Sequence, residues 1–256
     1  AQEKELKTAA VSEQPLPEGN ALLEVRGLQK TYTSTGNMVI RGIDLRLEAG
    51  EIVWLIGANG ARKSTAIKCI VGILRPDSGE ICFDGKNVQQ DLSGFKAKTG
   101  YVPDLSNAYE RISGIHYLER VASVYGISDA EERKERIYEI SKKLAFEKYL
   151  PHPIKTYSHG TKQKLNFIAG VLHRPRLLIL DEPMTGLDPG STIALIDRIK
   201  EYAAERNSVF FSSHLLNVVE NVCDTVGILK NGNLTGQYRV KGLNSGVKEL
   251  YREFNR

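Results

Sequence analysis

Residues 57–65, with the sequence GANGARKST, constrain the fold of this chain more than any other feature. They match the phosphate-loop pattern G-x-x-x-x-G-K-[ST] except at Arg62, where the pattern has glycine. A short apolar strand is predicted over 51–55 and a helix over 65–74, so the run lies between a strand and a helix, as such a loop must. The sequence therefore predicts an α/β domain built around a nucleoside triphosphate.

A loop of this kind has a definite physical task. Glycines such as Gly57 and Gly60 let the backbone curl so that successive N–H groups point at the β- and γ-phosphates, and the next helix adds its positive N-terminus. Lys63 is predicted to reach the same phosphates, and the Ser64 hydroxyl to hold Mg²⁺. A Gly-rich turn before an ordinary helix is the alternative, and it leaves the lysine and the hydroxyl unexplained. The predicted binding residues of the loop are Gly57, Asn59, Gly60, Ala61, Arg62, Lys63, Ser64 and Thr65.

Arg62 has two opposing effects on nucleotide binding, one steric and one electrostatic. If the backbone there needs a positive φ, a side chain costs on the order of 1 kcal/mol or more. Its bulk would crowd the β-phosphate, whereas its charge would attract a triphosphate. Sterics dominate if the side chain points into the cradle, and binding survives if it points outward. We predict weaker nucleotide binding and slower turnover than with glycine at this position.

Length and composition allow one large domain, or a domain with a subdomain, because 256 residues with 41% hydrophobic content support a full core. The net charge of +4 is spread along the chain, and no basic stretch with aromatics indicates a nucleic-acid partner. Three widely spaced cysteines favour reduced thiols in the cytosol over a disulfide scaffold or a zinc site. No apolar run approaches the ~18 residues of a membrane span, and no signal peptide is predicted.

Strand and helix patterns alternate towards both ends of the chain, with helices between them. Asn231-Gly232 predicts a hairpin turn, and residues 128–131 (SDAE) predict a capping box that opens a charged helix to about 149. The other predicted helices span 161–173 and 193–202, and strands are predicted over 22–25, 39–47, 79–83, 177–180 and 208–211. We expect a flexible tail over 1–20, an α/β domain over 21–240 with a helical subdomain inserted at about 104–170, and a helical tail over 241–256.

Two carboxylates, Asp181 and Glu182, follow the wholly apolar run at 177–180, which is typical of a buried parallel strand. In a phosphate-loop protein the first acid at that place supports Mg²⁺. The second is well placed to orient or deprotonate the attacking water. Acids at a strand end are otherwise often solvent-facing, and the phosphate loop favours the functional interpretation here.

With these motifs the chain resembles the nucleotide-binding subunit of an ATP-binding-cassette (ABC) transporter over about residues 21–240. Residues 157–163 (YSHGTKQ) are similar to the signature motif of that family, more often written L-S-G-G-Q. In the family this motif meets the γ-phosphate of ATP bound by the other subunit of a head-to-tail dimer. The resemblance therefore implies that Ser158 and the Gly160 N–H present donors to that nucleotide, next to a helix N-terminus.

Four further positions match the family one by one. Tyr32 stands where an aromatic stacks on adenine, and Asp188 ends a T-G-L-D loop that crosses the dimer interface. His214 matches the switch histidine that contacts the γ-phosphate. Asp104, after Tyr-Val-Pro, replaces a glutamine that senses Mg²⁺ and links ATP to the membrane subunit; it is shorter but acidic, so it would approach the metal through water.

The resemblance implies a P-loop NTPase core with a mainly parallel sheet, an N-terminal antiparallel β subdomain and an inserted α-helical subdomain. It implies ATP and Mg²⁺ as cofactors, Glu182, His214 and Lys63 as catalytic residues, and Ser64, Asp181 and Asp104 at the metal. It implies two partners, a transmembrane permease docked near residues 104–125 and a second nucleotide-binding subunit, at the cytoplasmic face of the membrane. The motif style is closest to bacterial drug, antimicrobial-peptide and sodium exporters.

Other functions are weighed against this one. A nucleotide-binding regulatory partner with little turnover of its own is favoured by Arg62 and Asp104, and disfavoured by the intact acids and His214. A DNA-repair or chromosome-organising ATPase would need a coiled-coil insertion or a basic surface, and a GTPase would need an Asn-Lys-x-Asp run. The sequence shows none of these.

Overall fold

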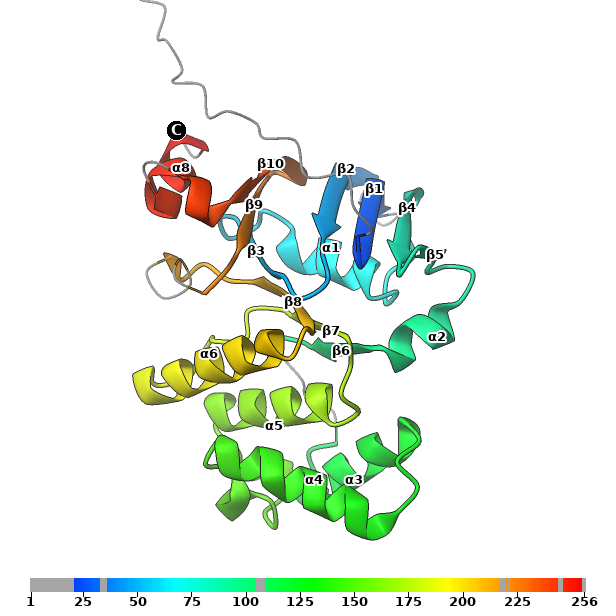
Figure 1. Ribbon diagram of the computed structural model, residues 1–256, viewed down its shortest axis with the longest axis vertical. Helices are drawn as coiled ribbons and strands as arrows, with labels where there is room; N and C mark the ends of the chain where they lie inside the picture. The colour runs from blue at the N-terminus through cyan, green and yellow to red at the C-terminus, as the bar shows by residue number, and fades with distance from the viewer. Residues whose placement is uncertain are drawn as a thin grey trace, which may run out of the picture.

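The computed structural model describes residues 21–32, 36–104, 109–216, 220, 222–243 and 246–254, so the predicted tail over 1–20 lies outside the described residues. Its strands form two sheets (Figure 1). The first is antiparallel, in the order β2-β1-β4-β5, from β1 (Leu23–Tyr32), β2 (Asn37–Leu47), β4 (Ser78–Phe83) and β5 (Lys86–Asn87).

The second sheet has the order β10-β9-β3-β8-β7-β6. All its pairings are parallel except the hairpin between β9 and β10. Its strands are β3 (Ile52–Ile56), β6 (Thr99–Val102), β7 (Leu177–Leu180), β8 (Ser208–Ser212), β9 (Thr225–Lys230) and β10 (Asn233–Arg239). The predicted α/β fold with a mainly parallel sheet and an N-terminal antiparallel sheet is confirmed.

Helices separate and cover the sheets. In Figure 1, α1 lies beside the antiparallel sheet, α3 and α4 form the end of the molecule farthest from that sheet, and α5 and α6 lie between these helices and the strands. The helices are α1 (Lys63–Ile70), α2 (Leu92–Ala97), α3 (Gly114–Val124), α4 (Ala130–Lys143), α5 (His159–Val171), α6 (Pro189–Ala204) and α8 (Gly246–Phe254), with 3₁₀ turns η1 (Glu147–Tyr149), η2 (Ile154–Thr156) and η3 (Val240–Gly242).

Strand β3, which leads into the phosphate loop, is buried along its whole length and joins two hydrophobic cores. Ile52, Trp54 and Ile56 pack in the core shared with α3 to α6, whereas Val53 and Leu55 pack in the core shared with β1, β2 and α1. Alternate side chains of a strand point to opposite faces, so one strand serves both cores. The end of β3, and with it the start of the phosphate loop, is held from both sides.

Some predicted boundaries were wrong for local reasons. The helix predicted to reach about 149 ends at Lys143, because Ala145 takes φ 50° and the chain turns to bury Phe146. Its cap is Asp129 rather than Ser128, since the Asp129 carboxylate accepts the N–H of Glu132 at 2.7 Å. Helix α6 begins four residues earlier than predicted, at Pro189, because the preceding residue caps it and proline is well suited to the first helical position.

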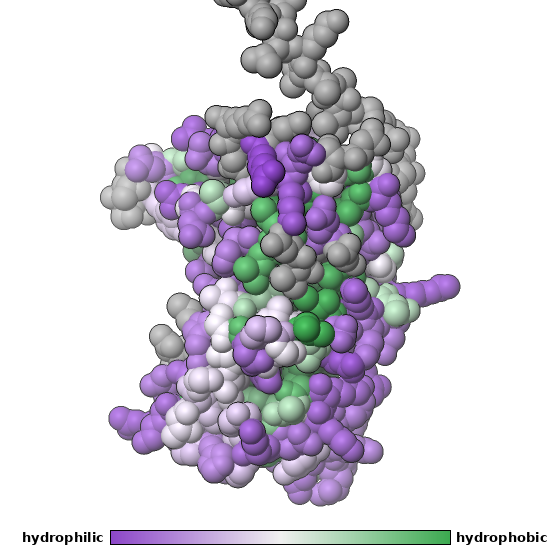
Figure 2. Space-filling model, turned by 90° about the vertical axis from the view of Figure 1, so that its left-hand side faces the viewer, coloured by the Kyte–Doolittle hydropathy of each residue, from purple (hydrophilic) through white to green (hydrophobic). Residues whose placement is uncertain are grey.

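Three further observations concern the surface, the cysteines and the length of the helices. Hydrophilic side chains cover most of the face in Figure 2, with an apolar strip through its middle. Cys69, Cys82 and Cys223 all lie in the described part of the chain and form no disulfide. Among the described residues, no helix is long and apolar enough to cross a lipid bilayer.

Candidate nucleotide-binding site

The phosphate loop lines a cleft of about 450 Å³ at the carboxyl ends of β3, β7 and β8. Ligands of open α/β sheets bind outside the carboxyl ends of parallel strands, where loops from different strands meet. The described residues that line the cleft are Ala58, Asn59, Gly60, Ala61, Arg62, Lys63, Ser64, Thr65, Asp104, Glu182, Thr185 and His214. The cleft thus brings together the predicted phosphate loop, Asp104, the second of the paired acids and the predicted switch histidine.

Lys63 begins α1 and is 6% exposed. Its Nζ donates to the Gly57 carbonyl at 2.8 Å and lies 3.2 Å from Glu182 Oε1. Gly57 itself fits only without a side chain, because a Cβ there would lie 2.5 Å from the Leu229 carbonyl oxygen. The lysine therefore stands within the loop with its charge compensated by the second acid.

Asp181 is the centre of a buried hydrogen-bond network. Its Oδ1 accepts from the Ser64 hydroxyl at 3.1 Å and from the Ser212 hydroxyl at 2.8 Å. Burial raises the pKa of Asp181 above its ordinary value, while the Ser212 and Ser64 hydrogen bonds oppose the rise. Ser212 also accepts the backbone N–H of Glu182 at 2.9 Å, so one hydroxyl fixes both acids.

Glu182 takes a left-handed backbone conformation, φ 47°, which non-glycine residues adopt rarely. This turn directs its carboxylate between two side chains: Oε1 lies 3.2 Å from Lys63 Nζ, and Oε2 lies 2.9 Å from His214 Nδ1. The Glu182 side chain is 13% exposed, against 50% for His214. Local strain of this kind is concentrated at functional sites.

Arg62 also has a left-handed backbone, φ 81° and ψ 23°, and occupies the N-cap position of α1. Its side chain makes no capping hydrogen bond and is exposed. The positive φ that the glycine pattern implied is therefore present, and arginine adopts it at a steric cost.

Asp104 also lines the cleft, and its Oδ1 is buried and without a hydrogen-bond partner among the described residues. Burial is the main reason why the pKa of Asp104 is raised, and the charges of Asp181 and Glu182 add to it. The Gln163 amide donates to the Asp104 backbone carbonyl and fixes the segment.

Six predicted site residues are not among the described residues that line the cleft: Gly57 and Asp181, which hydrogen-bond to the lining residues Lys63 and Ser64, and Tyr32, Ser158, Gly160 and Asp188. Tyr32 is close to it, with its hydroxyl 3.2 Å from Thr65 Oγ1. Ser158 caps α5 by accepting the Thr161 N–H at 3.2 Å, and Asp188 caps α6. A Cβ on Gly160 would lie 2.8 Å from the Gly186 carbonyl oxygen, so the signature segment packs against the T-G-L-D loop of its own chain.

Ser212 is a residue of this hydrogen-bond network that the sequence argument missed. Its signal was in the register of two strands: β7 and β8 run parallel with Leu180 opposite Phe211, so the next residues, Asp181 and Ser212, also lie side by side. Strand β7 is wholly apolar, and the residues of β8 directly before Ser212, Val209 to Phe211, are apolar as well. A polar residue directly after or at the end of such a strand is a candidate for the site.

The donors fit a magnesium ion. The Ser64 hydroxyl and the Asp181 carboxylate are hard oxygen ligands already 3.1 Å apart, and Mg²⁺ keeps several waters and phosphate oxygens in its shell. The orphaned Oδ1 of Asp104 is a further acceptor in the same cleft. Within the described residues no three His, Cys, Asp or Glu side chains form a metal cluster by themselves, so the protein would supply only part of the shell.

A phosphate loop with buried acids at the ends of parallel strands defines a nucleotide-binding protein of the P-loop class. The sequence pattern of the family described as "ABC transporter" matches residues 40–185. The ABC-type transporter ATP-binding protein EcsA of Bacillus subtilis (strain 168) is 36% identical over 231 residues, which cover 90% of this chain and 91% of EcsA. The linearmycin resistance ATP-binding protein LnrL of the same organism is 32% identical and covers 83% of this chain and 68% of LnrL.

A solved structure described as the ATP-binding subunit of an ABC transporter superposes with a TM-score of 0.83 at 32% identity, covering 92% of this chain and 100% of that one. The chain therefore belongs to the ABC transporter family, as one of its ATP-binding subunits.

Proposed function

We propose that this chain binds and hydrolyses ATP to power a membrane exporter. The observation that supports this most is the convergence of Lys63, Ser64, Asp181, Glu182 and His214 on one cleft. The backbone N–H groups of residues 57–65 would cradle the β- and γ-phosphates, and Tyr32, beside Thr65, would stack on the adenine.

The Lys63–Glu182 ion pair is the arrangement of the cleft before ATP binds. A γ-phosphate competes for Lys63, and when the lysine turns to it, Glu182 loses its cation and becomes free to accept a proton from the attacking water. His214 holds the other carboxylate oxygen and would donate to the γ-phosphate as charge develops. Ser64 and Asp181, with Asp104 nearby, would hold Mg²⁺, which neutralises phosphate charge when bound.

The signature residues lie away from the cleft of their own chain, which suits a site shared by two subunits. Ser158 and Asp188 are exposed at the N-termini of α5 and α6, where they and the Gly160 N–H would face the nucleotide of a second nucleotide-binding subunit. Closure of the pair on ATP and reopening after hydrolysis would drive a transmembrane permease docked near residues 104–125, at the cytoplasmic face of the membrane. The relation to LnrL, a resistance protein, supports export.

The test is ATP binding and phosphate release by the purified chain and its Glu182→Gln variant. Removing the general base should lower turnover by about 10²–10⁴-fold while ATP binding and ATP-dependent pairing persist. Lys63→Ala is the control that should lose binding. Equal turnover in the wild type and Glu182→Gln would contradict the assigned base, and equal ATP affinity in Lys63→Ala would contradict the site itself.

A nucleotide-binding regulatory partner with little turnover is the second candidate, favoured by the strained Arg62. It predicts that the wild type binds ATP without hydrolysing it, even with a transporter partner present. Recovery of turnover in Arg62→Gly would then assign the loss to that one residue.

A further inference from the structure

His214 stands on a turn that follows directly after β8, which ends at Ser212. Half of the His214 side chain is exposed, and its Nδ1 lies 2.9 Å from Glu182 Oε2. A half-exposed ring is not locked in place by packing, so its position in the cleft depends on the backbone of this turn. A displacement of about 1 Å at a reacting group can cost on the order of 10²-fold in rate.

The backbone of the turn is anchored by a side chain from another strand. The indole N–H of Trp54 donates to the Ser213 carbonyl at 3.0 Å, across 159 residues of sequence. Trp54 is 0% exposed and Ser213 is 1% exposed, so water does not compete for this hydrogen bond. A buried carbonyl that loses its donor carries its full desolvation penalty, and the turn would have to shift to find another partner.

The register of the parallel sheet explains how the indole reaches the turn. Strands β3 and β8 are neighbours (Figure 1), and Trp54 lies opposite Phe211 with the two ring planes 7° apart. Ser213 comes two residues after Phe211, so the indole extends past the last residue of β8. One rigid aromatic side chain thus connects the strand that enters the phosphate loop with the turn that carries His214.

The hydrophobic core by itself does not call for a tryptophan at this position. Ile52 and Ile56 lie on the same face of β3 as Trp54 and fill the same core without any polar atom. A buried indole brings an N–H group that needs a partner, which an aliphatic side chain would avoid. The hydrogen bond to Ser213 is therefore the feature that distinguishes Trp54 from its neighbours on the strand.

We propose that Trp54 is a positioning residue for His214: its indole N–H holds the Ser213 carbonyl and thereby keeps the histidine at the γ-phosphate. Trp54 is not among the described residues that line the nucleotide cleft, so it acts through the turn and not by contact with ATP. The inference rests on the proposed ATPase function. Because His214 would donate as charge develops in the reaction, losing its position should lower kcat more than it raises KM.

The first test removes the donor and keeps the shape. The chain has one tryptophan, so biosynthetic incorporation of β-(3-benzothienyl)alanine replaces the N–H of Trp54 alone by sulfur. The full chain should lose about ten- to a hundredfold in kcat for ATP and keep its KM within about twofold. The matched control is 5-fluorotryptophan at the same position, which keeps the N–H and should turn over like the wild type. An unchanged kcat with the sulfur isostere would overturn the proposal.

The same replacement in a His214→Ala background separates positioning from packing. If Trp54 acts through His214, the sulfur isostere should lower turnover no further once the histidine is absent. An equal fold-loss in both backgrounds would assign the effect to the core and overturn the proposal. Phe210→Leu, on the other face of β8, controls for a weakened strand: it should lower the melting temperature and leave kcat near that of the wild type.

A second readout needs no turnover. The fluorine NMR resonance of 5-fluorotryptophan at position 54 should differ between Mg·ATP, held unhydrolysed in the Glu182→Gln variant, and Mg·ADP, because only ATP offers His214 a γ-phosphate. The difference should vanish when His214→Ala is added. Mg·ATP binding with the same resonance as Mg·ADP, or a difference that survives His214→Ala, would overturn this inference and leave the proposed ATPase function standing. Absence of Mg·ATP binding, measured by nucleotide titration, would overturn both.

Discussion

Replacing Arg62 by glycine tests how a single departure from the phosphate-loop pattern acts. The residue has φ 81°, where a non-glycine side chain costs on the order of 1 kcal/mol, and the variant removes that cost. For a chain of this size the gain corresponds to a rise in melting temperature of about 2–4 °C. The strain is present with and without nucleotide, so it changes stability and not affinity.

Affinity depends on bulk and charge at the wall of the cleft. Crowding beside a phosphate costs about 1–3 kcal/mol, by analogy with overpacking, and the attraction of an exposed guanidinium at about 4 Å in water is worth about 1 kcal/mol. Sterics win by about 1 kcal/mol, so Arg62→Gly should bind ATP about fivefold more tightly and hydrolyse it faster.

Fluorescent-nucleotide titration and phosphate release measure the two quantities, and Arg62→Ala is the matched control. Alanine removes the charge and the long stem but keeps the Cβ, so it should recover affinity without the gain in melting temperature. Equal ATP affinity and turnover in wild type and Arg62→Gly would refute the steric argument. Weaker ATP binding in the glycine variant would show that charge, and not bulk, dominates.

Three other substitutions have predicted outcomes. Ser212→Ala should lower the free energy of unfolding in urea by about 1–3 kcal/mol and reduce turnover, because the Asp181 carboxylate and the Glu182 N–H each lose a buried hydrogen-bond partner. Unchanged stability would contradict the hydrogen-bond network around Asp181. Burial lowers the pKa of His173 from 6.5 to about 4. Between pH 6.5 and pH 4 the His173 ring therefore takes up a proton in the unfolded chain but not in the folded one. The contribution of His173 to stability is complete above pH 6.5 and is lost as the pH falls toward 4. The drop corresponds to at most about 3 kcal/mol, or about 1–2 after solvent screening of the partly exposed ring. Parallel urea titrations of His173→Gln should show a loss of stability that is smaller by this amount. Gly232→Ala should destabilise the fold by about 1–3 kcal/mol in thermal melts, since its Cβ would lie too close to the Val39 carbonyl oxygen. An unchanged melting temperature would contradict the close approach of the β9–β10 hairpin to β2.

The sequence predicted the bounds of an element best where the spacing of its apolar residues agrees with the burial that the fold gives it. The strand predicted over 177–180 has the same bounds as β7, since a wholly apolar run between polar residues leaves little choice of ends. The hairpin at Asn231-Gly232 is also confirmed, because both residues take the positive φ that its turn requires. Helix ends were less predictable. They depend on which side chain captures the first free N–H, as at Asp129, and on where a buried aromatic such as Phe146 must turn inward.

The site was predictable in its members more than in its contacts. Motif matching named the phosphate loop, the paired acids and His214, and the structure brings all of them to one edge of the sheet. The Lys63–Glu182 pair could not be derived from the sequence, because it depends on the unusual φ of Glu182 and on a register between separate strands. The roles of Ser158, Gly160 and Asp188 stay predictions, since they concern contacts with another subunit.

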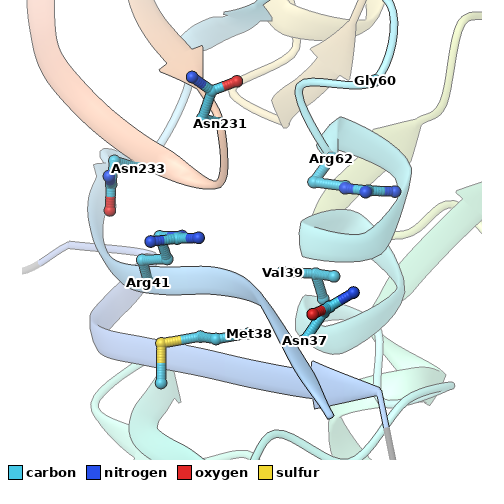
Figure 3. A pocket seen from close by; sticks show the side chains of 8 residues that line it. All are labelled: Asn37, Met38, Val39, Arg41, Gly60, Arg62, Asn231 and Asn233. Carbon is cyan, nitrogen blue, oxygen red and sulfur yellow. The ribbon is translucent and has the colours of Figure 1, made fainter. Parts of the chain in front are cut away.

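Arg62 shows why a motif mismatch has to be judged with its backbone and its neighbours. In the sequence it is a defect in a glycine pattern. In the structure its backbone has the left-handed φ of 81° that the glycine pattern implies, and its exposed side chain, which extends over α1 in Figure 3, makes no capping hydrogen bond to that helix. The cost of that backbone conformation lowers the stability of the fold, whereas the bulk and the charge of the side chain act on ATP. Arg62→Gly removes all three contributions, and Arg62→Ala removes the charge and most of the bulk but keeps the backbone cost. Melting temperature and ATP affinity, measured in both variants, therefore separate the backbone contribution of Arg62 from its side-chain contribution.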